Sequence, residues 1–397
     1  MKMVLENYNR CTGCGACAPI CASHSITMIP DKEGFLSPII DETSCTNCGL
    51  CSRNCPANQS LPSKLFHGEP LEVLAAWHLN EDIRAESSSG GIFTAIAQNI
   101  LERGGVVVGA TLDKQLIVRH ILIETISELP QLRRSKYVQS DLSIEVYQKI
   151  RLRLLENMLV LFSGTPCQVA GLRQFLRKDY TNLLCCDIIC HGTPSPLLWK
   201  TYLHQMQAKG LSIRHVSFRD KCEGWSKSGL AMRHYYSDGS EKGFLTSSFT
   251  KAFITDICLR NSCYACDYSK TTRVADITLG DYWGISKCHP GLDIGDKGTS
   301  LLLVNSLKGR DWIQNCSNSI SITNSHISKA LPGNPMLQRS PHFRFERVNF
   351  YRDLQKSYKT TTLKYDLGKQ TRIFSYLSKI LRLFDFASYR FFRQKGK

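Results

Sequence analysis

Eight cysteines near the N-terminus have the residue type and the spacing that bind metal clusters. They form two C-x2-C-x2-C-x3-C runs, at Cys11, Cys14, Cys17 and Cys21 and at Cys45, Cys48, Cys51 and Cys55. Three thiolates two residues apart wrap one corner of a [4Fe–4S] cubane, and the fourth cysteine of each run ligates the other cluster because it cannot bend back. The expected ligand sets are Cys11, Cys14, Cys17 and Cys55 for one cluster and Cys45, Cys48, Cys51 and Cys21 for the second.

Zinc binding and disulfide formation are the alternative uses of these cysteines. Zinc sites usually take two C-x2-C pairs separated by a longer gap, whereas here four cysteines share one run, twice. Disulfides need an oxidising compartment, and the opening residues M-K-M-V-L-E-N-Y contain no apolar signal-peptide core. The sequence therefore predicts a cytoplasmic protein with a bacterial-type two-cluster ferredoxin domain at residues 1–60.

The remaining chain is long enough for further domains and is strongly basic at its end. It has 397 residues, a formal net charge of +16 and 18 cysteines, of which the N-terminal runs use eight. Residues 339–397 contain 15 basic and 4 acidic side chains. No apolar stretch approaches the ~20 residues of a transmembrane helix. We therefore expect a soluble protein that contacts a membrane at most peripherally, through its basic tail.

The basic tail carries no signature of a nucleic-acid-binding fold, so we expect no nucleic-acid partner. We place it at residues 341–397 and expect it to be helical. Within Ile373–Phe392, apolar residues share one helical face: Ile373, Leu377, Ile380 and Phe384. This pattern favours packing on the body or on a partner over insertion into lipid, although a membrane surface stays an alternative.

Between the two ends, strand and helix patterns alternate after a polar linker at residues 61–72. Val73–Trp77 and Met158–Phe162 read as strands, Ile144–Leu155 as an amphipathic helix and Phe244–Leu259 as a longer helix. Such alternation predicts an α/β domain, which we place at residues 73–340. Two of its strands end in turns that contain a cysteine, and ligands collect at strand ends in open α/β sheets.

A run of small residues precedes one predicted helix of this domain. Ser88, Ser89, Gly90 and Gly91 stand before an apolar pattern that continues from Ile92. Free backbone amides at a helix N-terminus form an anion site that suits a phosphate or pyrophosphate. Serine-rich helix caps without any ligand are also common, so these residues alone leave both interpretations open.

Four of the remaining cysteines could form a third metal site. Cys263 and Cys266 form a C-x2-C pair, and Cys167 and Cys190 each follow a predicted strand. A cubane needs four thiolates, and a local pair plus two strand ends can supply them. The alternative ligands are Cys186 and Cys258. Buried free cysteines are the other interpretation, and it suits Cys185, Cys222, Cys288 and Cys316 best.

Several further motifs occur in one order along the chain. They are S-S-S-G-G-I-F, S-K-Y-V-Q-S, G-T-P-C-Q-V-A-G-L, C-H-G-T-P-S, S-F-R-D-K-x2-G-W, C-Y-A-C, R-V-A-D-I-T-L-G-D-Y-W-G and K-G-T-S. This set resembles the coenzyme F420 hydrogenase/dehydrogenase beta-subunit family, over about residues 1–310. Members of that family include ferredoxin-dependent 7-hydroxymethyl chlorophyll a reductase and bacterial proteins of polysaccharide biosynthesis.

The resemblance implies an FAD-binding domain with a [4Fe–4S] cluster close to the flavin. Under it, Ser88–Gly91 would hold the FAD phosphates, and Lys136, Thr165, Arg273 and Lys297 would add charge or hydrogen bonds. The resulting fold class is α+β: a two-cluster ferredoxin domain, an α/β flavin-binding domain with a mixed sheet, and a helical basic tail.

The function expected from these features is electron transfer to an organic acceptor. Electrons from a ferredoxin-like partner would pass through the clusters to FAD, which carries the two-electron chemistry. His191 is a candidate proton donor beside Cys190, or it only hydrogen-bonds its own loop. The alternative function is a non-catalytic electron-transfer subunit that docks on a hydrogenase or dehydrogenase partner.

Overall fold

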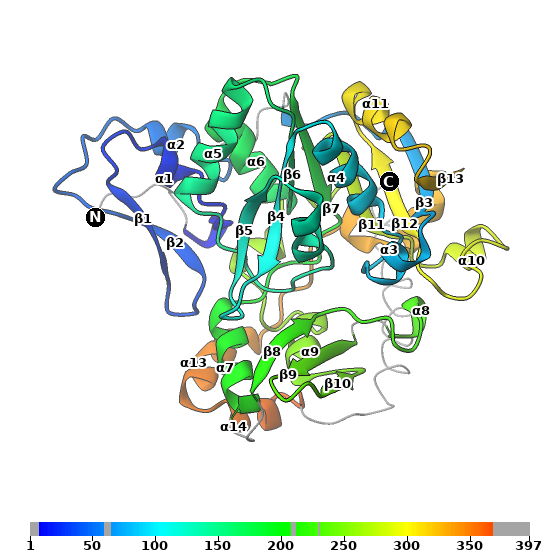
Figure 1. Cartoon of the computed structure of the whole chain (residues 1–397). Helices are drawn as coiled ribbons and strands as arrows, with labels where there is room; N and C mark the ends of the chain where they lie inside the picture. Colours follow the sequence, from blue (N-terminus) through cyan, green and yellow to red (C-terminus); the bar gives the residue numbers. More distant parts are fainter. Residues whose placement is uncertain (1–7, 59–64, 208–211, 229–230, 368–397) are drawn as a thin grey trace, which may run out of the picture.

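An eight-stranded mixed sheet forms the centre of the molecule in the computed structural model, which describes residues 8–58, 65–207, 212–228 and 231–367 (Figure 1). In spatial order its strands are β13 (Ile320–Asn324), β3 (Glu72–His78), β12 (Ser300–Val304), β11 (Ile277–Asp281), β7 (Leu183–Ile188), β6 (Val160–Gly164), β4 (Val106–Leu112) and β5 (Val118–Ile123). Strands β11, β7, β6 and β4 run parallel, and the outer strands pair antiparallel. The carboxyl ends of β6, β7 and β11 therefore meet at one edge, where ligands bind in open α/β sheets.

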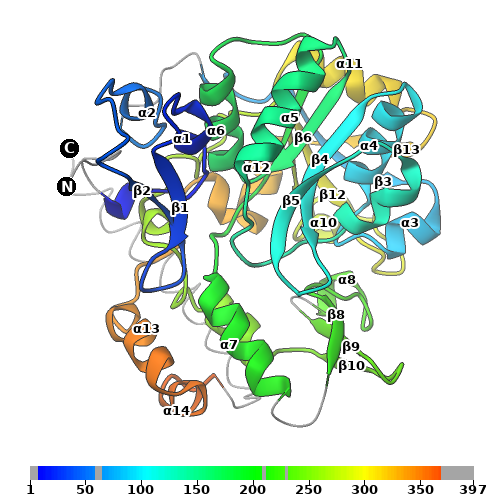
Figure 2. The same cartoon turned by 60° about the vertical axis from the view of Figure 1, so that its left-hand side comes forward.

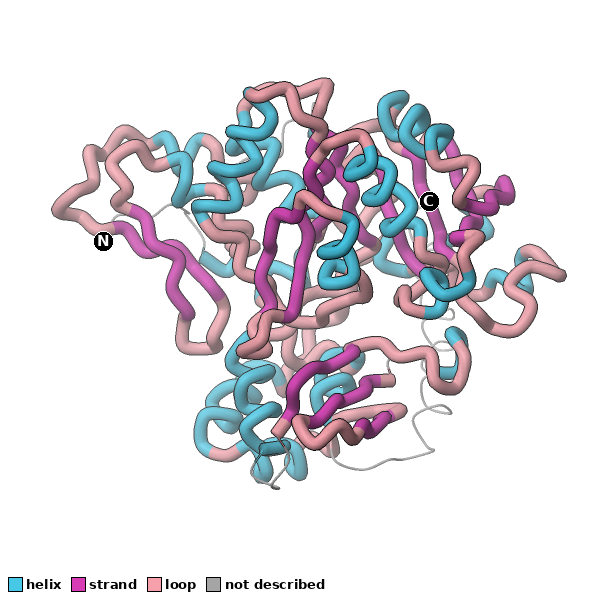
Figure 3. Tube along the Cα trace, in the orientation of Figure 1, coloured by secondary structure: helices cyan, strands magenta, loops and turns pink. Residues whose placement is uncertain are grey.

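Helices cover both faces of this sheet (Figure 3). One face carries α4 (Ile92–Glu102), the 3-10 helix η3 (Ile126–Leu132) and α11 (Leu307–Asn315), and the other carries α5 (Ile144–Leu155) and α6 (Pro166–Leu176). Side chains alternate across a strand. Val107 and Leu161 therefore pack toward α4, whereas Val106, Val108 and Phe162 pack toward α5 and α6. The apolar runs of β4 and β6 are those of strands buried on both faces.

The N-terminal cysteine runs lie in a small unit beside α5 and α6 (Figure 2). Its elements are the 3-10 helix η1 (Tyr8–Arg10), α1 (Cys17–Ile20), the antiparallel hairpin β1 (Ile26–Pro30) and β2 (Leu36–Ile40), and α2 (Leu50–Arg53). Helix α1 packs on both α5 and α6. The structure thus joins this unit to the sheet domain through the helices that cover one face of the sheet.

A second lobe lies below the large sheet in the view of Figure 1. It is built from an antiparallel sheet of β10 (Glu241–Phe244), β9 (Met232–Tyr236) and β8 (Ile213–Ser217), and from α7 (Pro196–Gln207), α9 (Ser248–Ile254), α13 (Arg347–Lys356) and α14 (Tyr358–Lys364). Trp199, Phe249 and Phe350 belong to its core and are 3% exposed or less. A short helix, α8 (Trp225–Ser228), follows β8.

The remaining short helices connect these parts. They are α3 (Glu81–Ala85), η4 (Asn261–Ala265), α10 (Ile285–Cys288), α12 (Ile327–Ala330), η5 (Leu331–Gly333) and η6 (Pro335–Leu337). Among the described helices, none has the length and apolar character needed to span a lipid bilayer.

Two sequence expectations differ from these elements. The helix expected over Phe244–Leu259 is only α9, because Phe244 belongs to β10 and the positive φ of Asp256 (61°) interrupts the helical path. The tail expected from residue 341 begins with two helices, α13 and α14, that pack into the second lobe. The amphipathic helix expected at Ile373–Phe392 lies outside the described residues.

One buried ion pair ties the centre of the sheet together and provides a stability prediction. Arg273 lies 3.1 Å from Asp187 of β7, and the two side chains are 2% and 0% exposed. Burial raises the pKa of Asp187, and the Arg273 charge opposes that rise. Replacing Arg273 with methionine leaves a buried, uncompensated carboxylate, so we expect a loss of about 3–5 kcal/mol in the free energy of unfolding.

Urea unfolding followed by circular dichroism measures this loss. The control is Arg310→Met, which breaks the half-exposed pair with Glu72. That pair should contribute less than about 1 kcal/mol, because water screens exposed charges. Equal losses in the two variants would contradict the importance given to the Arg273 pair.

Candidate functional site

The structure brings the first three cysteines of run one together with the last cysteine of run two. Burial raises the pKa of the Cys17 thiol well above its usual range, and its neighbours Cys14, Cys11 and Cys55 raise it further. Cys17 begins α1, and the loop before it contains glycines in the left-handed region. We call Cys11, Cys14, Cys17 and Cys55 the first set; Cys17 lies near the other three and also near Cys51 of the second run, so this ligand set stays a prediction.

Cysteines of the second set lie nearer the surface. Burial raises the pKa of Cys51, and its neighbours Cys21 and Cys48 contribute to this rise. Cys48 is exposed, and Cys45 lies in the same loop and is half-buried. Gly49, directly after Cys48, has a φ of +69° at the start of α2, a conformation that favours glycine. The second set thus forms the outer end of the N-terminal unit.

The loop of the first set packs directly against the sheet domain. The Tyr147 hydroxyl of α5 donates a hydrogen bond of 2.8 Å to the Cys14 carbonyl oxygen. Gly171 of α6 faces the same cysteine: a Cβ added there would lie 2.9 Å from both Cβ and Sγ of Cys14. Real Cβ atoms do not approach other atoms this closely, so only glycine lets the cysteine loop sit on α6.

This contact predicts that Gly171→Ala destabilises the protein, although a glycine-to-alanine change within a helix is usually stabilising. Alanine normally stabilises a helix by about 1 kcal/mol relative to glycine. Here the added methyl group overlaps Cys14, and overpacking destabilises by about 1–3 kcal/mol. We therefore expect a lower melting temperature and an altered electron paramagnetic resonance signal from the first cluster. Gly68→Ala is the control, because a Cβ at Gly68 meets nothing within 4 Å. An unchanged signal and a higher melting temperature for Gly171→Ala would contradict the contact.

The four cysteines expected to form a third site also lie together, in a set that we call the inner set (Cys167, Cys190, Cys263 and Cys266). Cys167 is in the first turn of α6, Cys190 follows β7, and the other two lie at η4. Burial raises the pKa of Cys167 well above its usual range, and Cys190, Cys266 and Cys263 raise it further. All four line a cavity of about 450 Å³.

The two alternative ligands lie elsewhere. Cys186 points into the apolar core between the sheet and α4, and Cys258 is part of the core of the second lobe. Neither residue is in the described lining of the 450 Å³ cavity. The geometry therefore favours Cys190 over Cys186, and Cys263 with Cys266 over Cys258.

Two buried tyrosines lie between the first set and the inner set. Burial raises the pKa of both Tyr147 and Tyr268 well above the usual range, and in each case Cys14 and Cys167 raise it further. Each ring is thus a neighbour of a thiol from either set. The first set and the inner set are adjacent across the interface between the N-terminal unit and the sheet domain.

A larger cavity of about 610 Å³ opens on the other side of the inner set. Cys167, Cys190 and His191 line both this cavity and the smaller one, so the two share a wall. The larger cavity lies at the carboxyl ends of β6, β7 and β11. Its charged residues, within the described part of its wall, are four basic and one acidic: Arg133, Arg134, Lys136, Arg219 and Asp281. The cavity is therefore suited to an anionic molecule.

The predicted phosphate loop borders this larger cavity. Ser88, Ser89 and Gly91 line it, and Gly91 is the N-cap of α4 with a φ of +90°. Gly90 does not line the cavity but packs against β12, where its N–H donates to the Ser300 hydroxyl at 2.9 Å. A Cβ at Gly90 would lie 2.4 Å from the carbonyl oxygen of Ala76 in β3, so this close approach requires glycine.

The four residues expected to add charge or hydrogen bonds divide into two pairs. Lys136 and Thr165 line the larger cavity, and the Lys136 ammonium donates to the carbonyl oxygens of Gln131 (3.0 Å) and Arg133 (2.6 Å). Of the two cavities, Arg273 lines only the smaller one of about 450 Å³, and its guanidinium forms an ion pair with Asp187.

Lys297 lies outside both described cavity linings. Its ammonium forms an exposed ion pair of 2.9 Å with Glu81. The structure therefore does not bring Lys297 or Arg273 to the larger cavity.

His191 lies in the wall between the two cavities. Its Nε2 is 2.7 Å from an Asp256 carboxylate oxygen, and its ring packs edge-on against Phe253. This pair fixes the orientation of the imidazole in the loop that follows Cys190. The structure therefore supports a hydrogen-bonding role in the loop and also leaves the ring facing both cavities.

Sequence reasoning missed a buried group at the larger cavity. Arg219 is 3% exposed, forms an ion pair with Asp281 and lies over the Trp283 ring, 4.8 Å from its centre. Its Nη2 has no hydrogen-bond partner among the described residues. The S-F-R-D-K and D-Y-W-G motifs contained these residues, so the signal was present but was assigned no role.

His120 was also missed, and the sequence offered no signal for it. Its ring is buried in the cavity wall, with Nδ1 3.0 Å from the Ser140 hydroxyl and Nε2 3.1 Å from the Ser163 carbonyl oxygen. Burial lowers its pKa to about 4. Ser140 in turn accepts a hydrogen bond from Gln168, which caps α6 near Cys167.

The fold and the cysteine sets define an iron–sulfur protein that joins a two-cluster unit to a mixed α/β domain. Three family models match it: a 4Fe-4S dicluster domain over residues 10–59, and the coenzyme F420 hydrogenase/dehydrogenase beta subunit, N-terminal part over residues 73–144 and C terminus over residues 157–330. The chain belongs to the coenzyme F420 hydrogenase/dehydrogenase beta-subunit family. The iron–sulfur interpretation of the N-terminal cysteines and the general redox role are thereby confirmed.

Comparison with solved structures and curated proteins adds little beyond the family. A chain of the F420-reducing [NiFe] hydrogenase complex from Methanosarcina barkeri is similar at 16% sequence identity and a TM-score of 0.46; the match covers 74% of this chain and 94% of that chain. No curated protein matches the sequence.

Proposed function

We propose that this protein is an iron–sulfur flavoprotein that passes electrons from a ferredoxin-like donor through three [4Fe–4S] clusters to FAD and then to an organic acceptor. The observation that carries the proposal is the order of the sites. The second set with its exposed Cys48, the first set, the inner set and the larger cavity follow one another, and each borders the next.

The inner set fits a cubane on three counts. It supplies four thiols, all four line one cavity that shares a wall with the larger one, and hydrogen-bond donors stand beside it. The Thr165 hydroxyl is 3.1 Å from the Cys167 sulfur. Hydrogen bonds to cluster sulfurs are one of the factors that set reduction potential. We propose Cys167, Cys190, Cys263 and Cys266 as the ligands.

The larger cavity fits FAD by charge and by position. Its wall is net positive, and the N-terminus of α4 with Ser88, Ser89 and Gly91 offers amides and hydroxyls to a diphosphate. Lys136 and Thr165 stand on the same wall. When bound, FAD supplies the exchange between single electrons from clusters and a two-electron reduction of the acceptor. The protein contributes the cationic wall and the closeness of the inner set.

His191 is the side chain that we propose for proton delivery at the cavity. It lies beside Cys190, faces the cavity and is oriented by Asp256. A proton donor must lie within hydrogen-bond reach of the atom that receives the proton. If His191 only shapes its loop, His191→Gln should keep the acceptor turnover and its dependence on pH.

Anaerobic reconstitution with iron, sulfide and FAD tests the proposed function. We expect the purified chain to retain about one FAD, bleached by reduced ferredoxin or dithionite and reoxidised by an added acceptor. A preparation with filled clusters but no retained flavin would contradict the flavoprotein assignment.

A non-catalytic beta subunit is the second candidate, and one surface feature favours it. Phe343 and Phe345 are 49% and 85% exposed; the Phe343 ring packs edge-on against Tyr264 on the inner-set loop, and Phe345 packs against Phe343. Exposed aromatic side chains are typical of protein interfaces. Under this candidate the isolated chain would bind FAD without turnover, and a catalytic subunit would copurify with it.

A further inference from the structure

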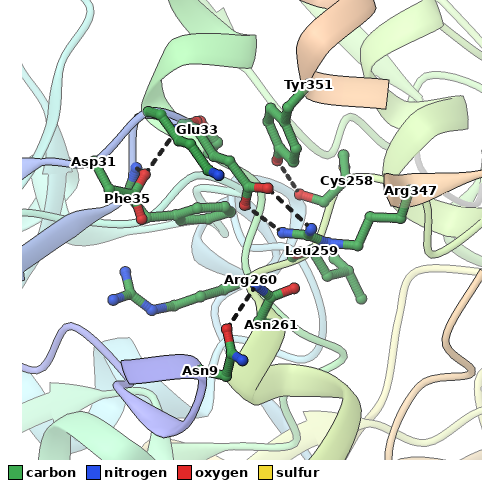
Figure 4. A network of polar contacts seen from close by, with 12 residues as sticks. Asn9, Asp31, Glu33, Phe35, Cys258, Leu259, Arg260, Asn261, Arg347 and Tyr351 are labelled. Carbon is green, nitrogen blue, oxygen red and sulfur yellow. Dashed lines mark hydrogen bonds and ion pairs between the residues drawn. The ribbon is translucent and has the colours of Figure 1, made fainter. Parts of the chain in front are cut away.

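A single buried arginine connects the loop of the first set with the loop of the inner set. Arg260 stands just before η4, which holds Cys263. Its Nε donates to the carbonyl oxygen of Cys11 at 2.5 Å, Nη1 donates to the carbonyl oxygen of Leu36 at 3.0 Å, and Nη2 donates to the Ser37 hydroxyl at 3.0 Å. Figure 4 shows this side chain reaching from Leu259 and Asn261 toward Phe35.

The first-set loop is shaped to receive this guanidinium. Gly13, between Cys11 and Cys14, has a φ of +67°. A Cβ on Gly13 would lie 2.8 Å from Nη1 of Arg260 and 2.1 Å from Nε2 of Gln139. The N–H of Leu36 donates to Gln139 at 2.9 Å, so a second side chain of the body holds the same segment. Arg260 and Gln139 therefore hold this part of the N-terminal unit in one position.

The charge of Arg260 has no acidic partner in the described part of the chain. Arg260 is 5% exposed, and its guanidinium donates to two carbonyl groups and one hydroxyl. A buried cation is strongly unfavourable without a compensating negative charge. The neighbouring Arg347 differs, because it pairs with both carboxylate oxygens of Glu33, at 3.1 and 2.6 Å (Figure 4).

The two thiol sets supply the missing negative charge once they are ligands. The Arg260 guanidinium donates to the carbonyl oxygen of Cys11 in the first set, and the carbonyl oxygen of Arg260 accepts a hydrogen bond of 2.9 Å from the N–H of Cys263 in the inner set. Arg260 therefore lies within electrostatic reach of both. Thiolates bind a cluster in the deprotonated form, so both occupied sites would present negative charge to the same guanidinium.

We propose that Arg260 is a positioning residue that fixes the first cluster against the inner cluster and whose unpaired charge raises the reduction potentials of both. The proposal rests on the proposed function for its inner cluster. A nearby cation stabilises the more negative reduced form of a cluster, and net charge is one of the factors that set cluster potential. The outer cluster, held by the second set, lacks this contact and should not respond.

Potentiometric electron paramagnetic resonance on the reconstituted full chain tests the proposal. Arg260→Met should lower the midpoint potentials of the first and inner clusters and weaken the magnetic interaction between them, without moving that of the outer cluster. Arg260→Lys keeps the positive charge, but its single nitrogen cannot replace the three nitrogens of the guanidinium. The midpoint potentials of the two clusters should therefore stay close to those of the wild type, while the magnetic interaction between the clusters should weaken. If Arg260→Met does not fold, the lysine variant and the polar, uncharged Arg260→Gln carry the same comparison.

The matched control is Arg347→Met, which removes another buried arginine that holds the N-terminal unit, here from α13 of the second lobe to Glu33. It should make the N-terminal unit more susceptible to proteolysis, because the unit is held less tightly. The reduction potentials of the clusters should not change. Equal shifts in the two variants, or unchanged potentials in Arg260→Met with full iron content, would overturn the proposal. A wild-type chain with only two clusters would instead contradict the proposed inner cluster, while the first cluster alone would still test Arg260.

Discussion

Replacing Cys263 with alanine should remove one cluster and disconnect the N-terminal clusters from the flavin. The thiol belongs to the inner set and lines the cavity shared with Cys167 and Cys190. Iron content should fall from about twelve to about eight atoms per chain, since each cubane contains four. The two N-terminal clusters should still be reduced by dithionite, but electrons from reduced ferredoxin should no longer reach FAD.

The matched control for this experiment is Cys258→Ala. Cys258 lies five residues before Cys263 and is fully buried, but it is packed in the core of the second lobe. Its removal should lower stability slightly, as a small core truncation does, and should leave iron and electron transfer unchanged. If the Cys258 variant loses the iron while the Cys263 variant keeps it, the ligand assignment is wrong.

Replacing Lys136 with methionine should weaken FAD binding without affecting the clusters. The ammonium stands on the wall of the larger cavity, held by two carbonyl groups. A hydrogen bond to a charged group contributes about 1.5–3 kcal/mol. The dissociation constant of FAD should therefore rise about tenfold to hundredfold. Flavin fluorescence during equilibrium dialysis measures the change, with Lys149→Met, an exposed lysine of α5, as the control.

The same lysine predicts how FAD affinity depends on pH. Burial, together with the charge of Arg134, lowers the pKa of Lys136 to about 7. A bound diphosphate favours the protonated form, so binding raises this pKa. Affinity should then be highest below pH 7 and fall as the pH rises above it.

The histidines that face Lys136 do not produce this trend. Burial, aided by the Lys136 charge, lowers the pKa of His120 to about 4 and lowers that of His215 below its ordinary value, so neither histidine loses a proton as the pH rises above 7. The pH dependence should disappear in Lys136→Met. A wild-type affinity that is constant from pH 6 to about pH 8.5, above the lysine pKa, would contradict an electrostatic role for this residue.

The sequence predicted those elements whose residue pattern lies within one short segment of the chain. The helix expected at Ile144–Leu155 has those bounds in the structure, because its apolar positions recur at helical spacing and face one core. The mixed sheet and the N-terminal two-cluster unit are likewise confirmed. The cysteine runs are local as well, because three ligands of each cluster follow one another with two residues between neighbours.

The features that the sequence did not predict depend on contacts between distant residues. Arg260 acts on Cys11, and Arg219 pairs with Asp281, across separations that no periodicity reveals. The way in which the start of the tail joins the body also depends on distant contacts. Its basic residues dominate the composition, yet Phe350 and Leu354 pack in the core of the second lobe and make α13 part of the folded body.

Counting the electrons that one chain accepts tests the central claim most directly. Coulometric reduction of the reconstituted protein should take up about five electrons per chain, one for each of three clusters and two for FAD. An uptake of about two electrons would mean that only the N-terminal clusters are present. That result would contradict both the inner cluster and the flavin.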